Sequence, residues 1–86
     1  GAELDDLAQA RLSSLKAWRL EVAREHGLPA YVIFHDATLT NMAQLAPQSE
    51  TDLGAISGVG ARKLQAYGKE LLRLLRLSDA PQQQSA

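Results

Sequence analysis

The chain has 86 residues, of which 45% are hydrophobic, and a formal net charge of −1 at pH 7. This length predicts one small domain, and the apolar content excludes a disordered chain. The absence of cysteine excludes disulfide frameworks and thiolate metal sites, and the net charge argues against strong non-specific binding of nucleic acids. No apolar run reaches the roughly 20 residues of a membrane span, and no signal peptide is recognisable. We therefore expect a soluble intracellular protein, located in the cytoplasm or nucleoid if it is bacterial.

The first predicted element is a helix that begins at Asp5 or Asp6 and ends near Glu25. Acidic residues suit a helix N-terminus, and His26-Gly27 suits a C-terminus because glycine readily adopts the left-handed cap conformation. At about 100° per residue, seven apolar side chains share one face. They are Leu4, Leu7, Ala8, Leu12, Leu15, Trp18 and Val22. We expect this stripe, including the tryptophan, to face the core.

The run from Leu28 to Leu39 is the densest stretch of β-branched and aromatic residues in the chain. A strand needs a partner, and no second run of this kind is present. Pro29 also removes a backbone donor and disfavours helix at the residue before it. We therefore interpret residues 28–34 as a buried apolar connector between helices.

Two short helices are predicted next. Asp36 is expected to cap a helix that ends near Ala46, where Pro47 stops it. Ser49, with an acidic residue at Asp52, resembles a capping box that opens a helix of little more than one turn. This helix is expected to bury two side chains, Leu53 and Ile56.

The last helix is expected from Val59 or Gly60 to Leu77, after a tight turn at residues 57–60. Its core stripe is predicted to be Leu64, Tyr67, Leu71, Leu74 and Leu75. Gly68 falls within this stripe and is expected to let another helix approach closely. The elements together predict an all-α bundle of about five helices over residues 4–77, with residues 1–3 as a terminal extension and residues 78–86 as a flexible polar tail.

The ionisable residues do not form a recognisable catalytic or metal site. Arg19 lies near the apolar stripe and is expected to pair with Asp36 or Asp6. His26 and His35 have no companion cysteine, whereas a zinc site needs three or four ligands. The carboxylates fall at helix starts, where capping explains them. We expect no catalytic residue, no metal and no cofactor.

Several segments, taken in order, resemble the HRDC domain (helicase-and-ribonuclease-D C-terminal). They are Leu15-Lys16-Ala17-Trp18-Arg19, Pro29-Ala30-Tyr31-Val32-Ile33-Phe34-His35-Asp36-Ala37-Thr38-Leu39, Ile56-Ser57-Gly58-Val59-Gly60-Ala61-Arg62-Lys63-Leu64 and Tyr67-Gly68. The resemblance implies a five-helix accessory domain that binds nucleic acid and is not itself an enzyme. Residues 34–39 resemble the RecQ-type helicase branch more than the ribonuclease branch. The implied parent is an ATP-dependent DNA helicase acting in DNA repair and recombination.

The resemblance places an aromatic residue that meets single-stranded DNA at Tyr31. Stacking of a base on an aromatic ring is worth about 1–3 kcal/mol. The alternative is a buried ring whose hydroxyl is hydrogen-bonded. Three further residues are candidates for a contact beside it: Lys16, Arg24 and His35.

Two further features of the last helix suit phosphate binding. Four cations line the face opposite the core, Arg62, Lys69, Arg73 and Arg76, and the alternative is an ordinary solvated face. Gly58 and Gly60 resemble a helix-hairpin-helix turn, in which backbone N–H groups bind a phosphate. The alternative is that a tight turn alone requires these glycines.

An acidic middle segment suggests a second class of function. Residues 27–57 carry no lysine or arginine but contain three acidic residues, Asp36, Glu50 and Asp52. Three more acidic residues lie near the N-terminus: Glu3, Asp5 and Asp6. The first prediction is an accessory domain that binds single strands, forks or junctions weakly. The alternative is a regulatory module whose acidic surface contacts the helicase core or a partner protein. In both cases we expect a monomer without a membrane partner.

Overall fold

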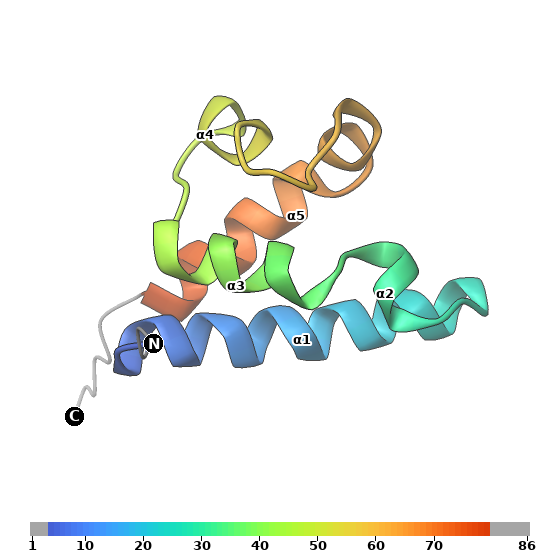
Figure 1. Cartoon of the computed structure of the whole chain (residues 1–86), viewed down its shortest axis with the longest axis horizontal. Coiled ribbons are helices and arrows are strands. Elements are labelled where there is room, and N and C mark those ends of the chain that lie inside the picture. Colours follow the sequence, from blue (N-terminus) through green and yellow to red (C-terminus); the bar gives the residue numbers. More distant parts are fainter. Residues whose placement is uncertain (1–3, 80–86) are drawn as a thin grey trace.

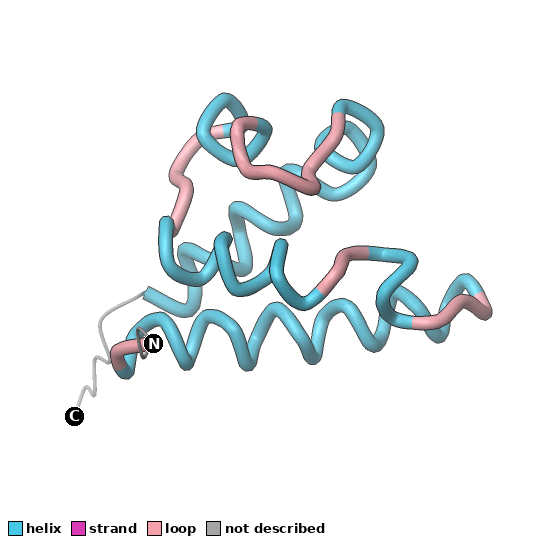
Figure 2. The backbone as a smooth tube through the Cα atoms, in the orientation of Figure 1, coloured by secondary structure: helices cyan, strands magenta, loops and turns pink. Residues whose placement is uncertain are grey.

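The computed structural model describes residues 4–79, and within them it contains five helices and no strand. The helices are α1 (Asp6–His26), α2 (Ala30–Ile33), α3 (Asp36–Leu45), α4 (Glu50–Gly54) and α5 (Ala61–Asp79). The long helix α1 runs along one side of the molecule and packs against α2, α3 and α5, while α4 packs on α5 (Figures 1 and 2). The predicted all-α bundle of about five helices is confirmed. The expected terminal extension and most of the expected tail, residues 80–86, lie outside the described residues.

The ends of α1 agree with the prediction. Asp5 is the N-cap, and its carboxylate accepts a hydrogen bond of 2.8 Å from the backbone N–H of Ala8. Gly27 is the C-cap with φ 64°, and its N–H donates to the carbonyls of Ala23 and Arg24. A side chain at Gly27 would be strained in this left-handed conformation, so the cap fixes where the chain leaves the helix.

Most of the predicted stripe of α1 faces the core, but one member does not. Leu15, Trp18 and Val22 are buried, whereas Leu7 is 49% exposed. Leu7 lies about 80° around the helix from Leu15, at the edge of the stripe. The helices that cover the centre of the stripe leave this edge in solvent.

The connector after α1 contains the single turn α2, which the sequence did not predict as helix. Ile33 and Phe34 are buried, at 2% and 3% exposure, but Leu28, Tyr31 and Val32 are exposed. The prediction of a buried connector is therefore correct for only part of the segment. A single turn packed against α1 buries only the residues on one side, and the others point outward.

The two short helices differ in how they begin. His35, not Asp36, occupies the N-cap position of α3, and no side-chain hydrogen bond caps that helix. Asp36 is the first residue of α3, and its carboxylate binds Arg19 of α1 instead. In α4 the prediction is confirmed, because the Ser49 hydroxyl accepts a 3.0 Å hydrogen bond from the N–H of Asp52. The two apolar side chains expected in this region are buried: Leu53 and Ile56.

The turn before α5 depends on one glycine. Gly58 has φ 96°, and a Cβ added there would collide with Oγ1 of Thr38 in α3. The helix that follows reaches Asp79, two residues past its expected end. Its core side includes Leu72, which is 6% exposed and was absent from the predicted stripe.

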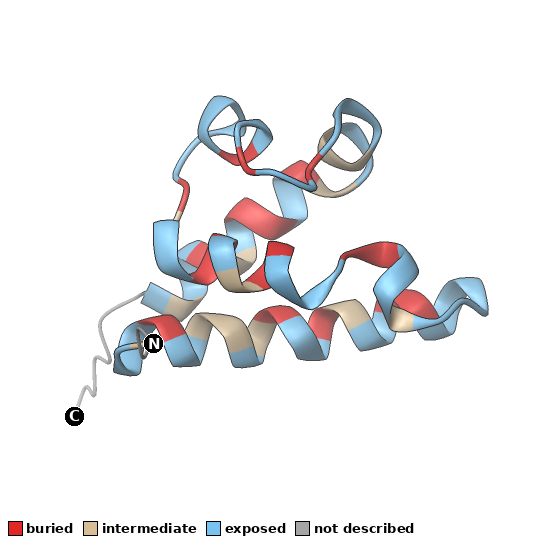
Figure 3. Ribbon diagram, in the orientation of Figure 1, coloured by how far each residue is buried: buried red, intermediate tan, exposed pale blue. Residues whose placement is uncertain are grey.

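Three aromatic rings join the helices around α2. Trp18 of α1 lies 6.1 Å from Phe34 and 5.3 Å from Tyr67 of α5, measured between ring centroids. Phe34 and Tyr67 meet edge to face at 6.1 Å. The buried residues coloured in Figure 3 face the space between the helices. Phe34, which follows the last residue of α2, is therefore packed between α1 and α5.

Candidate nucleic-acid interface

The nine lysine and arginine residues form two groups. Three are partly buried and bind backbone or carboxylate oxygens: Arg11, Arg19 and Lys63. The other six are exposed and make no hydrogen bond or ion pair within residues 4–79: Lys16, Arg24, Arg62, Lys69, Arg73 and Arg76. All six exposed cations are among the candidate DNA contacts predicted from the sequence.

Tyr31 lies in α2 and is 61% exposed. Its ring stacks against that of His35, with centroids 6.0 Å apart and planes inclined by 26°. The alternative interpretation, in which the Tyr31 ring is buried, is therefore wrong. One face of a paired aromatic group is presented on the surface beside α1.

The two candidate cations of α1 lie differently with respect to this aromatic pair. The hydrogen bond and charge of Arg19 hold the pKa of the Asp36 carboxyl below its usual value, and Lys16 contributes to the same effect. Lys16 lies one turn before Arg19 on α1, and Arg19 binds Asp36 at the start of α3, so Lys16 is on the side of α1 that faces the junction of α2 and α3. Arg24 is exposed in the last turn of α1, and no hydrogen bond or cation–π contact within residues 4–79 joins it to Tyr31.

The four cations of α5 follow one face of that helix, and we call them the basic stripe. Arg62 stands at the end near α2, because the next residue, Lys63, reaches the backbone of Val32. Arg76 lies 14 residues further on, about 21 Å along the helix axis. The basic stripe therefore begins near α2 and leads away from it.

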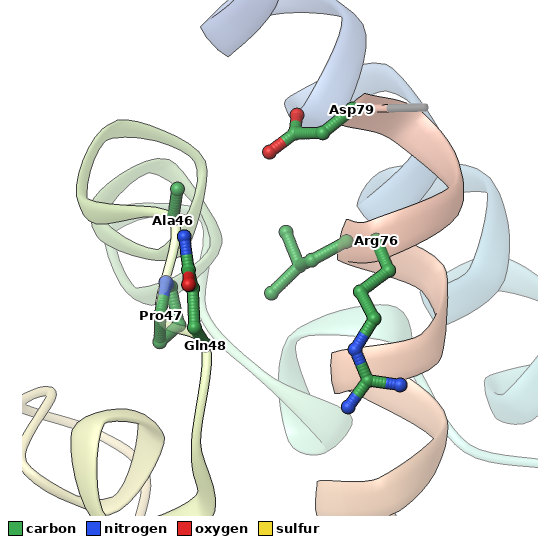
Figure 4. Close-up of a pocket in the computed structure, with 6 residues that line it drawn as sticks. Ala46, Pro47, Gln48, Arg76 and Asp79 are labelled. Atoms are coloured by element: carbon green, nitrogen blue, oxygen red, sulfur yellow. The ribbon is translucent and has the colours of Figure 1, made fainter. Parts of the chain in front are cut away.

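Arg76 also borders a cavity of about 260 Å³ at the other end of the molecule. The other lining residues are Ala46, Pro47, Gln48, Leu75 and Asp79. Figure 4 shows the Arg76 guanidinium directed away from the carboxylate of Asp79, which is bound to Arg11 at 2.7 Å. The lining offers one unengaged cation but no nucleophile with a neighbouring base, so it does not form a recognisable catalytic site.

The two glycines proposed for phosphate binding have different surroundings. Packing on Thr38 already requires a glycine at position 58. A Cβ added at Gly60 would meet no atom within 4 Å, so the surface before α5 is open. A backbone phosphate contact at Gly60 stays a prediction, while the glycine at position 58 has a structural reason.

The acidic residues are partly used within the fold. The Asp36 carboxylate lies 2.7 Å from Nη2 of Arg19, which identifies Asp36 rather than Asp6 as the arginine's partner. Asp5 caps α1. Glu50 and Asp52 are exposed on α4, and the remaining predicted member of the set, residue 3, lies outside the described residues.

Residues 4–79 contain no group of three or more histidine, cysteine, aspartate or glutamate residues placed to bind a metal ion. His26 ends α1, and His35 separates α2 from α3.

Within residues 4–79, no helix combines the length and apolar character needed to cross a membrane.

Sequence reasoning missed Lys63. Its Nζ donates to the carbonyl oxygens of Val32 and Ile33 at 2.7 and 2.6 Å, and it lies 5.3 Å from the centroid of the Phe34 ring. Lys63 is about 100° around α5 from Arg62 and so points to the flank of the basic stripe. That helical phase was the available signal that its role differs from that of its neighbour.

The comparisons with known proteins concern most of this chain. The family model described as the HRDC domain matches residues 8–75. Over 71 residues the chain is 48% identical to the ATP-dependent DNA helicase UvrD2 of Mycobacterium tuberculosis, which covers 83% of the chain and 10% of that protein. Over 75 residues it is 36% identical to the ATP-dependent DNA helicase RecQ of Pasteurella multocida, covering 87% of the chain and 11% of that protein. The chain thus spans about a tenth of the length of these relatives.

A solved structure has the same fold. It is described as the D. radiodurans RecQ HRDC domain 3, with a TM-score of 0.79, 28% sequence identity, and coverage of 85% of this chain and 97% of that one. The predicted resemblance is confirmed, and UvrD2 helicases share the domain with RecQ helicases. From the family match and the shared fold, the chain belongs to the HRDC family, a non-catalytic accessory domain that ATP-dependent DNA helicases carry and that also matches ribonuclease D proteins.

Proposed function

We propose that this domain belongs to an ATP-dependent DNA helicase and binds single-stranded DNA weakly, with Tyr31 as its stacking surface. The observation that carries the proposal is the ring of Tyr31, 61% exposed and paired with His35. An aromatic ring contributes little to folding when it stays in solvent, whereas stacking on a base is worth about 1–3 kcal/mol. An exposed aromatic pair in a helicase domain is therefore well suited to an unpaired base.

Exposed cations on two sides of α2 suit the phosphates that would flank such a base. Lys16 is one turn from Arg19, which binds Asp36 at the junction of α2 and α3, and Arg62 begins the basic stripe. Each phosphate neutralised on a single strand changes the slope of log K against log salt by about −0.7. Because the net charge is −1, we expect weak binding that is lost at higher salt. Forks and junctions expose such single strands, so the domain would adjust how the helicase engages them.

The test is a fluorescence anisotropy titration of a labelled single strand at two salt concentrations. We expect Tyr31→Ala to weaken binding by about 1–3 kcal/mol through the loss of stacking. The salt slope is expected to stay unchanged, because the substitution removes no charge. Leu45→Ala is the matched control, since Leu45 is a 68% exposed apolar residue on a different helix.

Circular dichroism of both variants checks that they remain folded. Tyr31→Ala affinity equal to that of the wild type and of Leu45→Ala would refute the stacking role. A weaker affinity accompanied by a smaller salt slope would instead indicate that the substitution disturbs the phosphate contacts.

A second candidate function rests on the acidic side of the molecule. Glu50 and Asp52 are exposed on α4, and residues 27–57 contain no lysine or arginine. This region suits a basic surface of the helicase core or of a partner protein. Titrations with single strands, forks and junctions at low salt separate the two functions. Absence of binding, combined with altered helicase activity when the domain is deleted, would favour the interaction module.

A further inference from the structure

The turn that carries Tyr31 is too short to hold its own shape. α2 has four residues, and helices of this length are unstable in isolation because few hydrogen bonds offset the cost of nucleation. The last carbonyls of any helix also lack partners within it. The position of Tyr31 therefore depends on what binds the backbone at the end of α2.

Lys63 of α5 supplies the first of these partners. Its ammonium group donates to the carbonyl oxygens of Val32 and Ile33, at 2.7 and 2.6 Å, and lies over the ring of Phe34. A cation at the C-terminal end of a helix also interacts favourably with the helix dipole. Two of the three donors of this ammonium group are thereby directed at the protein backbone.

Arg19 of α1 supplies the second partner. Its Nη1 donates to the carbonyl oxygen of Phe34 at 2.8 Å, and its Nη2 lies 2.7 Å from the Asp36 carboxylate. The side chain of Arg19 is only 11% exposed, so its bond to the Phe34 carbonyl is partly shielded from water, whereas the Asp36 carboxylate is 70% exposed. Together the two cations bind the carbonyls of residues 32–34, and we call this arrangement the carbonyl clamp.

We propose that Lys63, together with Arg19, is a positioning residue that holds α2 so that Tyr31 is presented to single-stranded DNA. The inference rests on the proposed function, because it assigns the support of the same site. Tyr31 precedes the clamped carbonyls and its stacking partner His35 follows them. Fixing the backbone between these two residues therefore fixes the geometry of the aromatic pair.

The competing role for Lys63 is a direct contact with a phosphate. The two roles differ in their salt dependence, because a phosphate contact contributes about −0.7 to the slope of log K against log salt. They also differ in whether α2 changes in the absence of DNA. Substituting a positioning residue changes the structure of α2 in the free protein, whereas substituting a phosphate ligand leaves α2 unchanged until DNA binds.

The experiment compares Lys63→Met with Lys69→Met. Both substitutions remove one positive charge from α5 and keep an aliphatic side chain, but Lys69 is exposed and makes no hydrogen bond or ion pair within residues 4–79. Amide NMR of the free domain follows α2, including the Val32 N–H, which donates to the Pro29 carbonyl at 3.1 Å. Anisotropy titrations at several salt concentrations give affinity and slope.

We expect Lys63→Met to shift the α2 amides, speed their exchange, and weaken single-strand binding about five- to tenfold, a partial loss of stacking, with the salt slope unchanged. In the Tyr31→Ala background the same substitution is expected to cost nothing further. Lys69→Met is expected to leave the α2 amides as in the wild type. Lys63→Arg, which keeps the charge and the donors, is expected to retain most of the affinity.

A reduced salt slope for Lys63→Met, with unchanged α2 amides and an effect that adds to that of Tyr31→Ala, would make Lys63 a phosphate ligand and overturn the proposal. Unchanged binding despite shifted α2 amides would overturn the positioning role alone. A wild-type domain that binds no oligonucleotide would overturn the proposed function together with this inference. If Lys63→Met fails to fold, Lys63→Gln, which keeps a neutral N–H donor group but not the charge, replaces it and is expected to give a smaller loss in the same direction.

Discussion

The carbonyl clamp and the basic stripe use the same residue types for opposite purposes. Arg19 is 11% exposed, and it is held by a carbonyl and a carboxylate. Arg73 and the rest of the basic stripe are exposed and have no ion pair within residues 4–79. The difference teaches that the direction of a cation around its helix, and not its presence in a basic segment, decides whether its charge serves the fold or a ligand.

The physical reason is the cost of removing a charge from water. A charge that is shielded without partners is strongly unfavourable, so a partly buried arginine or lysine requires oxygen acceptors. Lys63 finds them in the backbone of α2, one position along the chain from the exposed Arg62. Neighbours in the sequence thus belong to different functional groups.

The largest expected effect separates two arginines of α1 by their contribution to stability. Arg19→Met removes the donor to the Phe34 carbonyl and the partner of Asp36, and is expected to lower the free energy of unfolding by about 1–3 kcal/mol. Arg24→Met, at an exposed position, is expected to change it by less than about 0.5 kcal/mol. Urea unfolding followed by circular dichroism measures both. Equal stabilities of the two variants would contradict the division into internal and exposed cations.

The next effect concerns binding by the basic stripe. Arg73→Glu is expected to weaken single-strand binding several-fold and to reduce the magnitude of the salt slope by about 0.7, if one phosphate contact is lost. Its stability is expected to change little, because the side chain is exposed. Thr51→Glu adds negative charge at an exposed position of α4, outside the basic stripe, and serves as the control. If Arg73→Glu changed neither the affinity nor the salt slope, the basic stripe would be an ordinary solvated face without a role in binding.

The smallest effect is a pH dependence of the Arg19–Asp36 contact. Arg19 holds the pKa of the Asp36 carboxyl below its ordinary value of 3.8. The ion pair therefore contributes fully at pH values above that ordinary value, and its contribution is lost as the pH falls through the lower native pKa. We expect the stability difference between the wild type and Asp36→Asn to shrink over this acidic range. Glu25→Gln, at an exposed carboxylate, is the control, and a difference independent of pH would contradict the assignment.

Local signals predicted the elements well where a helix has its own start, stop and periodicity. Asp5, Gly27 and Ser49 cap helices as expected, because a cap involves atoms only a few residues apart. Asp36 is the exception: it suits a cap by residue type, but a cation from α1 takes its carboxylate. The prediction that Leu7 faces the core was wrong for a related reason. Periodicity defines which side chains share a face of the helix, but not how much of that face the neighbouring helices cover.

The sequence by itself determined the helical class, most of the core and the family, because periodicity, caps and motif spacing are written along the chain. Helical phase along the chain could also separate the exposed cations from the partly buried ones. Only the tertiary structure decided that Tyr31 lies in solvent on a single helical turn, stacked on His35. It also decided that Lys63 serves that turn, since the lysine and its carbonyl acceptors are 30 and 31 residues apart. Contacts over such distances depend on how α1 and α5 pack, which no local pattern encodes.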